Sequence, residues 1–410
     1  MSITLNFENT AAIDTDNPGS FNNLLDGYQP HHDVYFCSEE NTLLAHEPFA
    51  ALLVGEQKNI AAQVAESLRF ASELGLKNSV VIGAIPFDVE EKAYLRVSPN
   101  YSRLHFKEPP SNHEETLDLG DYRVREVPEP QIFMAGVKDA LARFARGELE
   151  KVVLSRTLEV DCDGAPNVRA MVKKLARKNA RGYTFAVDLN IPGEAKDKRT
   201  LIGSSPELLI SRRGNKVFAH PLAGSEPRSQ DPIIDKTNAN ALLASSKDRY
   251  EHALVVSAIA KKLAPFCKTL RVPEAPSLLS TATMWHLGSA IDGELINGNT
   301  SSIELALAMH PTPAVGGYPT HKAQAAIKEI ETHKRDLFAG MVGWCDASGD
   351  GEWAVTIRCA EVKNNKITLY AGAGIVTGST PEKELAETGA KFNTLLHALG
   401  VSLQGEIHGH

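Results

Sequence analysis

The residues of this chain best suited to chemistry are a lysine and several carboxylates at the ends of apolar segments. Lys151 opens the apolar segment KVVLSR, Glu207 follows a Ser-Ser-Pro turn, and Glu251 lies in the polar run KDRYEH. Two more carboxylates, Glu384 and Glu387, lie near the C-terminus. Such a set can supply a general base, a general acid and the oxygen ligands of a divalent cation around a small anionic substrate.

Two acidic pairs have the spacing of ligands carried by helices. Glu384, Glu387 and Lys391 are spaced i, i+3, i+7, and Asp248 and Glu251 are spaced i, i+3, so each group lies on one helix face. A solvated helix with an internal Glu–Lys pair would show the same spacing. Oxygen ligands from two helices are, however, what an octahedral Mg²⁺ site needs when water and a substrate carboxylate fill the remaining positions. The pattern therefore predicts a magnesium site, with the solvated face as the alternative.

Lys151 and Glu207 could serve as base and acid if the fold buries them. A lysine at the start of a strand usually extends its amine to solvent, which is the alternative interpretation for Lys151. In a closed pocket, loss of water would lower the pKa of a lysine and raise that of a glutamate. The first would become a usable base, and the second would be able to donate a proton.

Three further features could bind an anion. Arg358 interrupts the apolar segment TIRCA, and an inward-facing arginine there would need a carboxylate partner. The turn from Gly372 to Gly374 can bring backbone N–H groups close to an anion, although an isolated Gly-x-Gly is weak evidence. His252, beside Glu251, is expected to be structural because Mg²⁺ takes oxygen ligands.

One apparent calcium motif is rejected. Asp346, Ser348, Asp350 and Gly351 have the spacing of the start of an EF-hand loop, but Ile357 stands where the bidentate glutamate should be. The segment is predicted to be a hairpin turn.

Composition restricts the class of protein. With 410 residues, 42% hydrophobic and 23% charged, the chain is of ordinary globular type. A net charge of −8 and no Lys/Arg stripe argue against a nucleic-acid partner. No apolar run approaches the ~20 residues that cross a bilayer, and no signal peptide is apparent. The five cysteines form no Cys-x-x-Cys pair, which favours a reducing compartment. We therefore expect a cytoplasmic protein with a small-molecule substrate and no nucleic-acid or membrane partner.

The periodicity of apolar residues predicts an α+β fold, with helices covering antiparallel sheets. Residues 1–130 are less rich in motifs, residues 131–402 form the expected catalytic region, and residues 403–410 form a tail. Expected helices cover 60–74, 131–147, 167–179, 236–265 and 381–398; expected strands cover 78–85, 151–160, 183–190, 207–213, 216–221, 339–346, 352–362 and 366–371.

From about residue 130 to residue 400 the chain resembles the chorismate-utilising enzymes, which include isochorismate, salicylate, anthranilate and aminodeoxychorismate synthases. Within the family it most resembles the isochorismate synthases of catecholate-siderophore pathways. The resemblance implies one fold in which large antiparallel β-sheets form a sandwich with helices packed outside. In the family residues 1–130 would complete the same sheets, and a separate N-terminal lobe is the alternative. The segments that carry it are EKVVLSR, IGSSPELL, HPLAGSEPR, SSKDRYEH, MWHLGSAIDG, HPTPAVGGYP, RDLFAGMVGWCD, GEWAVTIRCAEV, LYAGAGIV and PEKELAETGAK.

Two positions discriminate within the family. Members that add an amine typically have glutamine where this chain has Lys151, whereas members that add water have lysine there as a base. Members that form a covalent adduct have lysine at the position of Ala223, so that nucleophile is absent here. The chain departs from the family at Glu226, where many relatives have arginine. Arg228 stands two residues further on, and no role is carried over to it from the relatives' arginine.

The resemblance implies a role for each site residue. Lys151 would activate water for attack at C2 of chorismate, and Glu207 would protonate the departing C4 hydroxyl, giving isochorismate. Glu251 and Glu387 would hold Mg²⁺, with Asp248 and Glu384 nearby or acting through water. Arg358 and the amides of Gly372 to Gly374 would take the enolpyruvyl carboxylate. The pocket would further be lined by Gly224, Ser225, His286 and Lys391.

Three alternatives stay open at this point. A salicylate synthase would make isochorismate and then eliminate pyruvate at the same site. An aminating enzyme is disfavoured by Lys151. A non-catalytic chorismate-binding relative would be expected to lack one of four side chains, and none is missing. These are Lys151, Glu207, Glu251 and Glu387. If the main interpretation holds, the enzyme is an isomerase whose partners include chorismate and an isochorismatase acting downstream in the same pathway.

Overall fold

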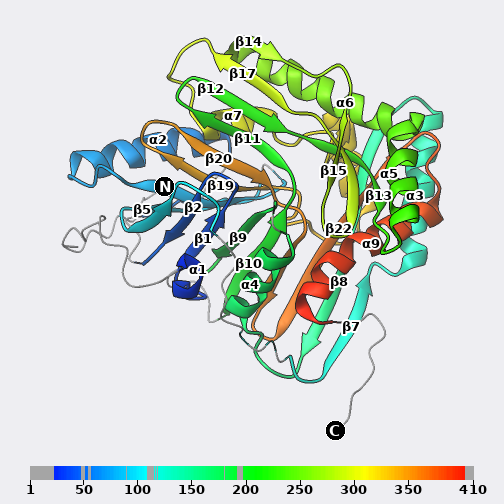
Figure 1. Ribbon diagram of the computed structural model, residues 1–410, viewed down its shortest axis with the longest axis horizontal. Helices are drawn as coiled ribbons and strands as arrows, with labels where there is room; N and C mark the ends of the chain where they lie inside the picture. The colour runs from blue at the N-terminus through cyan, green and yellow to red at the C-terminus, as the bar shows by residue number, and fades with distance from the viewer. Residues whose placement is uncertain are drawn as a thin grey trace.

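The computed structural model describes residues 23–47, 51–53, 57–88, 90–108, 115, 117, 119–179, 181–191 and 197–401. The predicted tail, 403–410, lies outside the described residues, as do residues 1–22. The predicted α+β fold is confirmed: two large antiparallel sheets and one small one are combined with helices (Figure 1).

The larger sheet carries the strand that begins at Lys151. Its two longest strands, β8 and β22, pair along their whole common length, from Lys151 opposite Val376 to Asp161 opposite Lys366. β7 and β18 lie against different parts of the outer edge of β8. In spatial order the strands are β18 (Gly317–Tyr318), β8 (Lys151–Cys162), β22 (Lys366–Val376), β21 (Cys359–Lys363), β10 (Arg199–Ser205), β9 (Tyr183–Asp188), β1 (Val34–Cys37), β2 (Thr42–Ala45) and β6 (Tyr101–Leu104), with β7 (Tyr122–Val127) beside β8.

The second sheet has nine strands, and a third has three. In the second the order is β14 (Cys267–Arg271), β17 (Ile291–Leu295), β12 (Lys216–His220), β11 (Leu208–Arg213), β20 (Gly351–Val355), β19 (Met341–Asp346), β4 (Val80–Ile85), β5 (Tyr94–Ser98) and β3 (Ala51–Leu53). In the third it is β13 (Leu222–Pro227), β16 (Met284–Gly288) and β15 (Ser277–Ser280).

Strands from the first 130 residues join both large sheets. β1 pairs with β9 in the larger sheet, and β4 pairs with β19 in the second. The segments before and after residue 130 therefore share hydrogen-bonded sheets.

Helices cover the sheets from outside. α4 and α9 pack on the larger sheet, where Figure 1 shows α9 lying over β22 and β8, while α6 and α7 pack on the second sheet and β13. None of the described helices is both long and apolar enough to cross a membrane. The helices are α1 (Leu24–Gly27), α2 (Gln57–Glu73), α3 (Pro130–Ala145), α4 (Val168–Lys178), α5 (Pro232–Ala244), α6 (Ser246–Leu263), the 3₁₀ turn Ala264–Phe266, α7 (Ser302–Met309), α8 (Thr320–Ile330) and α9 (Pro381–Leu399).

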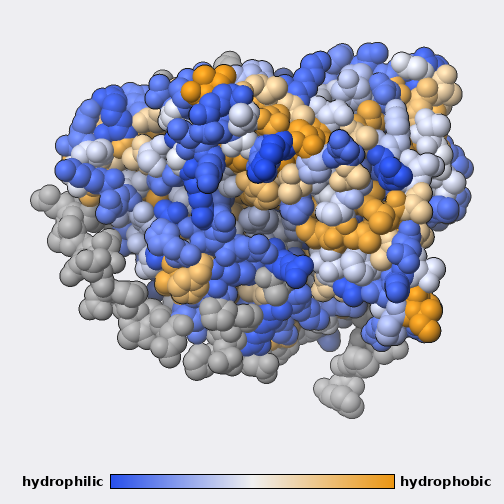
Figure 2. All heavy atoms as spheres, turned by 45° about the horizontal axis from the view of Figure 1, so that its top comes forward, coloured by the Kyte–Doolittle hydropathy of each residue, from blue (hydrophilic) through white to orange (hydrophobic). Residues whose placement is uncertain are grey.

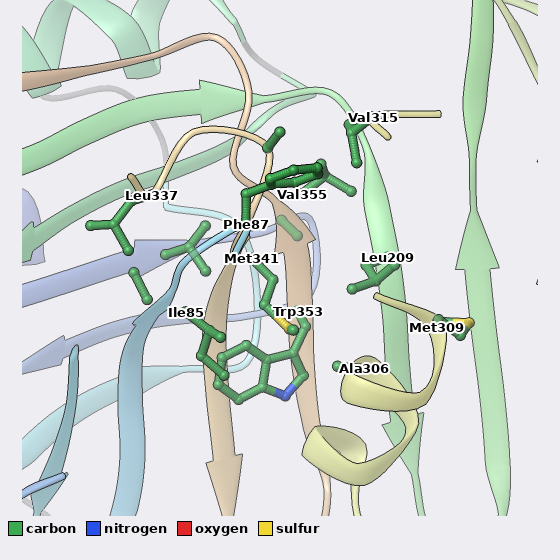
Figure 3. Packing of buried hydrophobic residues seen from close by; sticks show 14 of the residues in the cluster. Ile85, Phe87, Leu209, Ala306, Met309, Val315, Leu337, Met341, Trp353 and Val355 are labelled. Carbon is green, nitrogen blue, oxygen red and sulfur yellow. The ribbon is translucent and has the colours of Figure 1, made fainter. Parts of the chain in front are cut away.

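The main hydrophobic core lies between the two large sheets, because alternate residues of each strand point to opposite faces. Val34 and Phe36 of β1 belong to this core, whereas Tyr35 belongs to a second core beneath α4 and α9. Figure 3 shows the fully buried Trp353 packed near Ile85, Met341 and Ala306. On the outside, Figure 2 shows mainly hydrophilic residues, interrupted by smaller hydrophobic areas.

The single helix predicted over 236–265 is wrong. The structure has two helices, α5 and α6, separated at Ser245, which has extended backbone angles. The Ser245 hydroxyl accepts a hydrogen bond from Asp248 N at 3.2 Å, so this serine caps the second helix instead of continuing the first. The break places Asp248 in the first turn of α6 and Glu251 one turn further along.

The continuous strand predicted over 352–362 is also wrong. Residues up to Val355 form β20 of the second sheet, and residues from Cys359 onward form β21 of the larger sheet. The chain crosses between the sheets at residues 356–358, where Arg358 has φ +51°. Arg358 therefore lies on a crossover and is not part of a strand. The strand predicted over 366–371 is longer than expected and continues to Val376.

Close packing of β19 against β20 gives a prediction for the fold. A Cβ atom on Gly343 would overlap the carbonyl oxygen of Glu352 on the neighbouring strand. We expect Gly343→Ala to lower the free energy of unfolding by about 3 kcal/mol or more, because neither strand can move away inside the sheet. Gly164→Ala is the matched control, since that glycine has no atom near the position of an added Cβ. Chemical denaturation of both variants would contradict the prediction if their stabilities were equal.

Candidate active site

One pocket gathers the predicted substrate-binding residues. Its empty volume is about 660 Å³, which includes space on its open side. Its walls come from β13, β16, β22, α6, α9 and the crossover at Arg358. The predicted residues that line it are Glu207, Gly224, Ser225, Glu251, His286, Arg358, Gly372, Gly374, Glu387 and Lys391.

Lys151 lies beside the pocket rather than in its wall. Its side chain is fully buried, so the interpretation that it reaches solvent is wrong. Lys151 Nζ lies 2.8 Å from Glu251 Oε1 in an ion pair that joins β8 to α6. Gly374 makes this approach possible, because a Cβ there would overlap Glu251 Oε1 and lie 3.3 Å from Lys151 Cε. Glu251 thus stands between the lysine and the pocket.

Glu207 has the protonation behaviour of an acid catalyst. It is 3% exposed, and burial raises its pKa to about 7, although the Leu222 backbone and the cations Lys151, Arg358 and Lys391 act in the opposite direction. A substantial fraction is therefore protonated at neutral pH and can donate. The fold positions Glu207 directly before β11, where its carbonyl accepts from Val355 N.

Glu387 and Lys391 form a charged pair on α9. Lys391 Nζ lies 2.5 Å from Glu387 Oε1, and the Ser225 hydroxyl donates to the same oxygen at 3.2 Å. Burial alone would raise the pKa of Glu387, but Lys391, Lys247 and Ser225 outweigh it and lower the pKa. Glu387 is therefore ionised. The internal Glu–Lys pair of the alternative interpretation is present, but the face is largely covered, with the side chains of Glu387 and Lys391 22% and 12% exposed.

The other two predicted metal-site carboxylates lie next to the pocket and not in its wall. Glu384 is 1% exposed, and Lys247 donates to it at 2.9 Å. Burial and the negative charge of Glu387 raise the pKa of Glu384; burial, and then Glu251, raise that of Asp248. Mutual repulsion among carboxylates is what a bound cation would relieve, so the donor set fits Mg²⁺. Among the described residues, however, no three His, Cys, Asp or Glu side chains stand close enough to form a ready cation site.

Arg358 supplies a buried positive charge. It is 7% exposed, and burial lowers its pKa to about 10, partly offset by Glu387 and Glu207, so it stays protonated at neutral pH. No hydrogen-bond partner is found for its Nη2 among the described residues.

The backbone of β22 adds donors to the same wall. On β8, Val153 lies opposite Gly374, and Ser155 lies opposite Gly372. The N–H groups of Val153 and Ser155 point away from β22 and donate to Gly316 O and Glu331 Oε1. On the open side, Lys391 Nζ donates to Gly372 O at 2.8 Å. In an antiparallel ladder the N–H and C=O of one residue point the same way, so the N–H groups of both glycines face the pocket. They can bind an anion there.

The two histidines near the site differ. His252 is held by Ala223 O at 3.2 Å and Ser289 Oγ at 2.8 Å, and burial lowers its pKa to about 4. It is a neutral structural residue, as its position in the sequence suggested. His286 faces Ser225 across β13 and β16; burial lowers its pKa well below the ordinary value, and its Nε2 has no partner in the described part of the chain.

Sequence reasoning missed several pocket residues. Phe338 and Tyr370 stack with ring centroids 5.4 Å apart, and Ala314 and Val315 form another part of the wall. These residues fall within or beside the segments RDLFAG, LYAGAG and HPTPAVGG. Their type alone did not distinguish them from core residues. Lys247, which neutralises Glu384, was visible in SSKDRYEH as a lysine near two acids.

The sequence matches a protein family described as "Chorismate binding enzyme" over residues 89–400, more than half of the chain. It is 46% identical over 384 residues to isochorismate synthase DhbC of Bacillus subtilis, covering 92% of this chain and 96% of that protein. It is 38% identical over 384 residues to the vibriobactin-specific isochorismate synthase of Vibrio cholerae, covering 93% and 94%.

Solved structures agree with these matches. The crystal structure of DhbC from Bacillus anthracis superposes with a TM-score of 0.87 at 45% identity, covering 92% of this chain and 99% of that one. Anthranilate synthase component I from Streptococcus pneumoniae, at 22% identity and a TM-score of 0.68, shares the fold. By sequence and fold, this chain belongs to the chorismate-binding enzyme family.

Proposed function

We propose that this protein is an isochorismate synthase that isomerises chorismate in a Mg²⁺-dependent reaction. The observation that carries the proposal is a set of buried polar atoms in or beside one pocket that find no hydrogen-bond partner among the described residues. They are Lys151 Nζ, apart from its ion pair, His286 Nε2 and Arg358 Nη2. Buried polar atoms are normally satisfied, so these await a polar, anionic ligand. Chorismate, a dicarboxylate, is such a ligand.

Lys151 and Glu207 divide the proton transfers between them. Lys151 acts as base in its neutral form, after it has lost the proton that it holds in its ion pair with Glu251. The neutral amine then takes a proton from water as the oxygen bonds to C2. The ring double bonds shift, the C4–oxygen bond breaks, and Glu207 protonates the departing hydroxyl, which leaves as water. Glu207 is poised for this because its pKa is about 7. Acid and base catalysis each contribute roughly 10²- to 10⁴-fold.

The charged residues orient the two carboxylates of the substrate. Arg358 and the N–H groups of Gly372 and Gly374 form one anion site, for the enolpyruvyl carboxylate. Glu251 and Glu387, which line the pocket, would hold the cation, with Asp248 and Glu384 nearby or acting through water. When bound, Mg²⁺ would neutralise these acids and attract the ring carboxylate.

Water is the preferred nucleophile because a lysine, and not a glutamine, stands at position 151. The relatives named above are isochorismate synthases, which favours this product over salicylate. One is specific for the vibriobactin pathway, so we place the enzyme in siderophore biosynthesis, with an isochorismatase consuming its product. A reducing cytoplasm suits its five cysteines, all of them unpaired thiols.

The raised pKa of Glu207 predicts a pH-dependent stability. A carboxyl group whose pKa is higher in the folded state stabilises the fold at low pH and loses that contribution as the pH rises from about 4.5 to about 7. Glu207→Gln removes this pH dependence. Between pH 5 and 8 the free energy of unfolding of the wild type should therefore fall by about 3 kcal/mol or less relative to that of the variant. The variant should also lose about 10²-fold or more in kcat. If the free energies of unfolding of wild type and variant changed in parallel with pH, or if the variant turned over normally, Glu207 would not be the acid.

Replacement of Lys151 separates a base from a simple cation. Lys151→Arg keeps a positive charge beside Glu251 but cannot deprotonate, so it should stay folded and lose hydration of chorismate about 10²-fold or more. Lys151→Gln should lose activity and also stability, because Glu251 is left buried without its partner. Lys173→Gln, which removes another buried lysine that pairs with Asp26 and Glu115, is the control and should keep its kcat. An active Arg variant, with product measured by chromatography, would eliminate the base.

Removal of divalent cations should abolish turnover, and Mg²⁺ should restore it. Calorimetry should show Mg²⁺ binding to the wild type, weakened about tenfold or more in Glu251→Gln and Glu387→Gln, because each loses a charged oxygen ligand. Glu352→Gln is the control: that carboxylate is buried but bonded to Ser38 and Trp344. Full activity in excess chelator, with metal content verified, would be incompatible with this role.

A further inference from the structure

A second buried ion pair, between Arg335 and Glu331, lies at the edge of β8. It contacts the strand at Val153 and Ser155, which follow Lys151 by two and four residues. Arg335 and Glu331 are each 4% exposed and form a two-bond pair, with Nε to Oε2 at 2.9 Å and Nη2 to Oε1 at 2.6 Å. Neither residue lines the pocket.

This pair fills a gap in the pairing of β8. The strand's outer edge pairs with β18 at Lys151 and Val152 and with β7 from Thr157 onward. Between them, Arg335 Nη2 donates to Val153 O at 2.6 Å. Glu331 Oε1 accepts from the backbone N–H of Ser155 at 2.7 Å and from its hydroxyl at 2.9 Å. The side chains of Arg335 and Glu331 therefore bond backbone groups of β8 that a neighbouring strand bonds elsewhere along its edge.

Arg335 also fixes the opposite wall. Its Nη1 donates to Val315 O at 2.8 Å, and Val315 lines the pocket. The guanidinium lies over the ring of Phe87, with Cζ 4.4 Å from the ring centroid. Figure 3 shows Phe87 and Val315 in the same part of the core. A Cβ built on Gly316, the residue after Val315, would lie 3.8 Å from Phe87 Cε2, so the ring lies next to both the arginine and the Val315 loop, residues 310–317. A planar guanidinium with five donors can bind a carboxylate through two parallel bonds and still donate to two carbonyls, which the three donors of a lysine cannot do.

The consequence reaches Lys151 through the strand. Lys151, Val153 and Ser155 alternate along β8 and present their side chains on one face. Val153 forms part of the pocket wall, and the pair holds the backbone at Val153 and Ser155. A shift there would move the Lys151 amine relative to Glu251 and the pocket.

We propose that Arg335 and Glu331 form a positioning pair that sets the distance between the Lys151 strand and the Val315 loop, and so aligns the base for the reaction. The inference rests on the proposed function, in which Lys151 is the base. The pair touches no substrate. Buried ion pairs are weak sources of stability, because desolvation offsets their attraction, which favours a geometric role for this one.

The test compares Arg335→Lys with Arg96→Lys. Arg96 forms a similar buried pair with Asp188, at 2.9 Å and 3% exposure of each side chain, and also bonds a backbone carbonyl, Asn190 O. Lysine retains each charge but not the fork. For Arg335→Lys we expect kcat to fall about tenfold to a hundredfold, as for displacements near 1 Å, with the KM for chorismate changed less than threefold. For Arg96→Lys, with a similar loss in melting temperature, kcat should stay within twofold of the wild type.

Equal losses of kcat in both variants, or a kcat within twofold of the wild type for Arg335→Lys, would overturn the proposal. Glu331→Gln, with Asp188→Asn as its control, repeats the test with milder changes if Arg335→Lys does not fold. If neither variant of the pair folds while both controls do, the pair acts on the whole fold and the proposal is wrong. The wild-type product is identified first. A product other than isochorismate refutes the proposed function, while the ratio of variant to wild-type kcat still decides the role of the pair.

Discussion

The buried ion pair between Lys151 and Glu251 is the constraint on which the site depends. A fully buried lysine is stable only with a compensating partner, and Glu251 lies 2.8 Å from it. The pair requires α6 to approach β8 across β22, and this approach requires a glycine at 374. The break at Ser245 matters for the same reason, since it starts a separate helix that carries Glu251 to the pocket.

The remaining charges are arranged so that the site is nearly balanced before substrate binds. Lys391 pairs with Glu387, and Lys247 pairs with Glu384. In the part of the chain that the structure describes, Arg358 lacks a partner for one of its guanidinium nitrogens, and Glu207 is kept partly protonated by burial. A dianionic substrate accompanied by a divalent cation would preserve this balance. The arrangement explains why acid, base and anion site can coexist in a small buried volume.

Much of this site could be predicted from sequence, but its long-range contacts could not. The helical spacing of Glu384 and Glu387 and the strand that begins at Lys151 are local patterns, and they indicate the right elements. Burial of Lys151 depends on elements far away in the chain, so the spacing could not exclude an exposed lysine. Arg335 was missed because one of its acceptors, Val153 O, lies 182 residues away. The sequence predicts a strand through Arg358, because its apolar neighbours suit a buried strand as well as a buried crossover between sheets.

The central claim is that water, activated by Lys151, adds at C2 of the substrate. The most direct measurement is mass spectrometry of the early product formed from chorismate and Mg²⁺ in water enriched in ¹⁸O. The account predicts isochorismate carrying one ¹⁸O atom, at the C2 hydroxyl, with unchanged label when ammonium is present. Isochorismate without ¹⁸O would mean internal transfer of the hydroxyl and would contradict it, as would an aminated product.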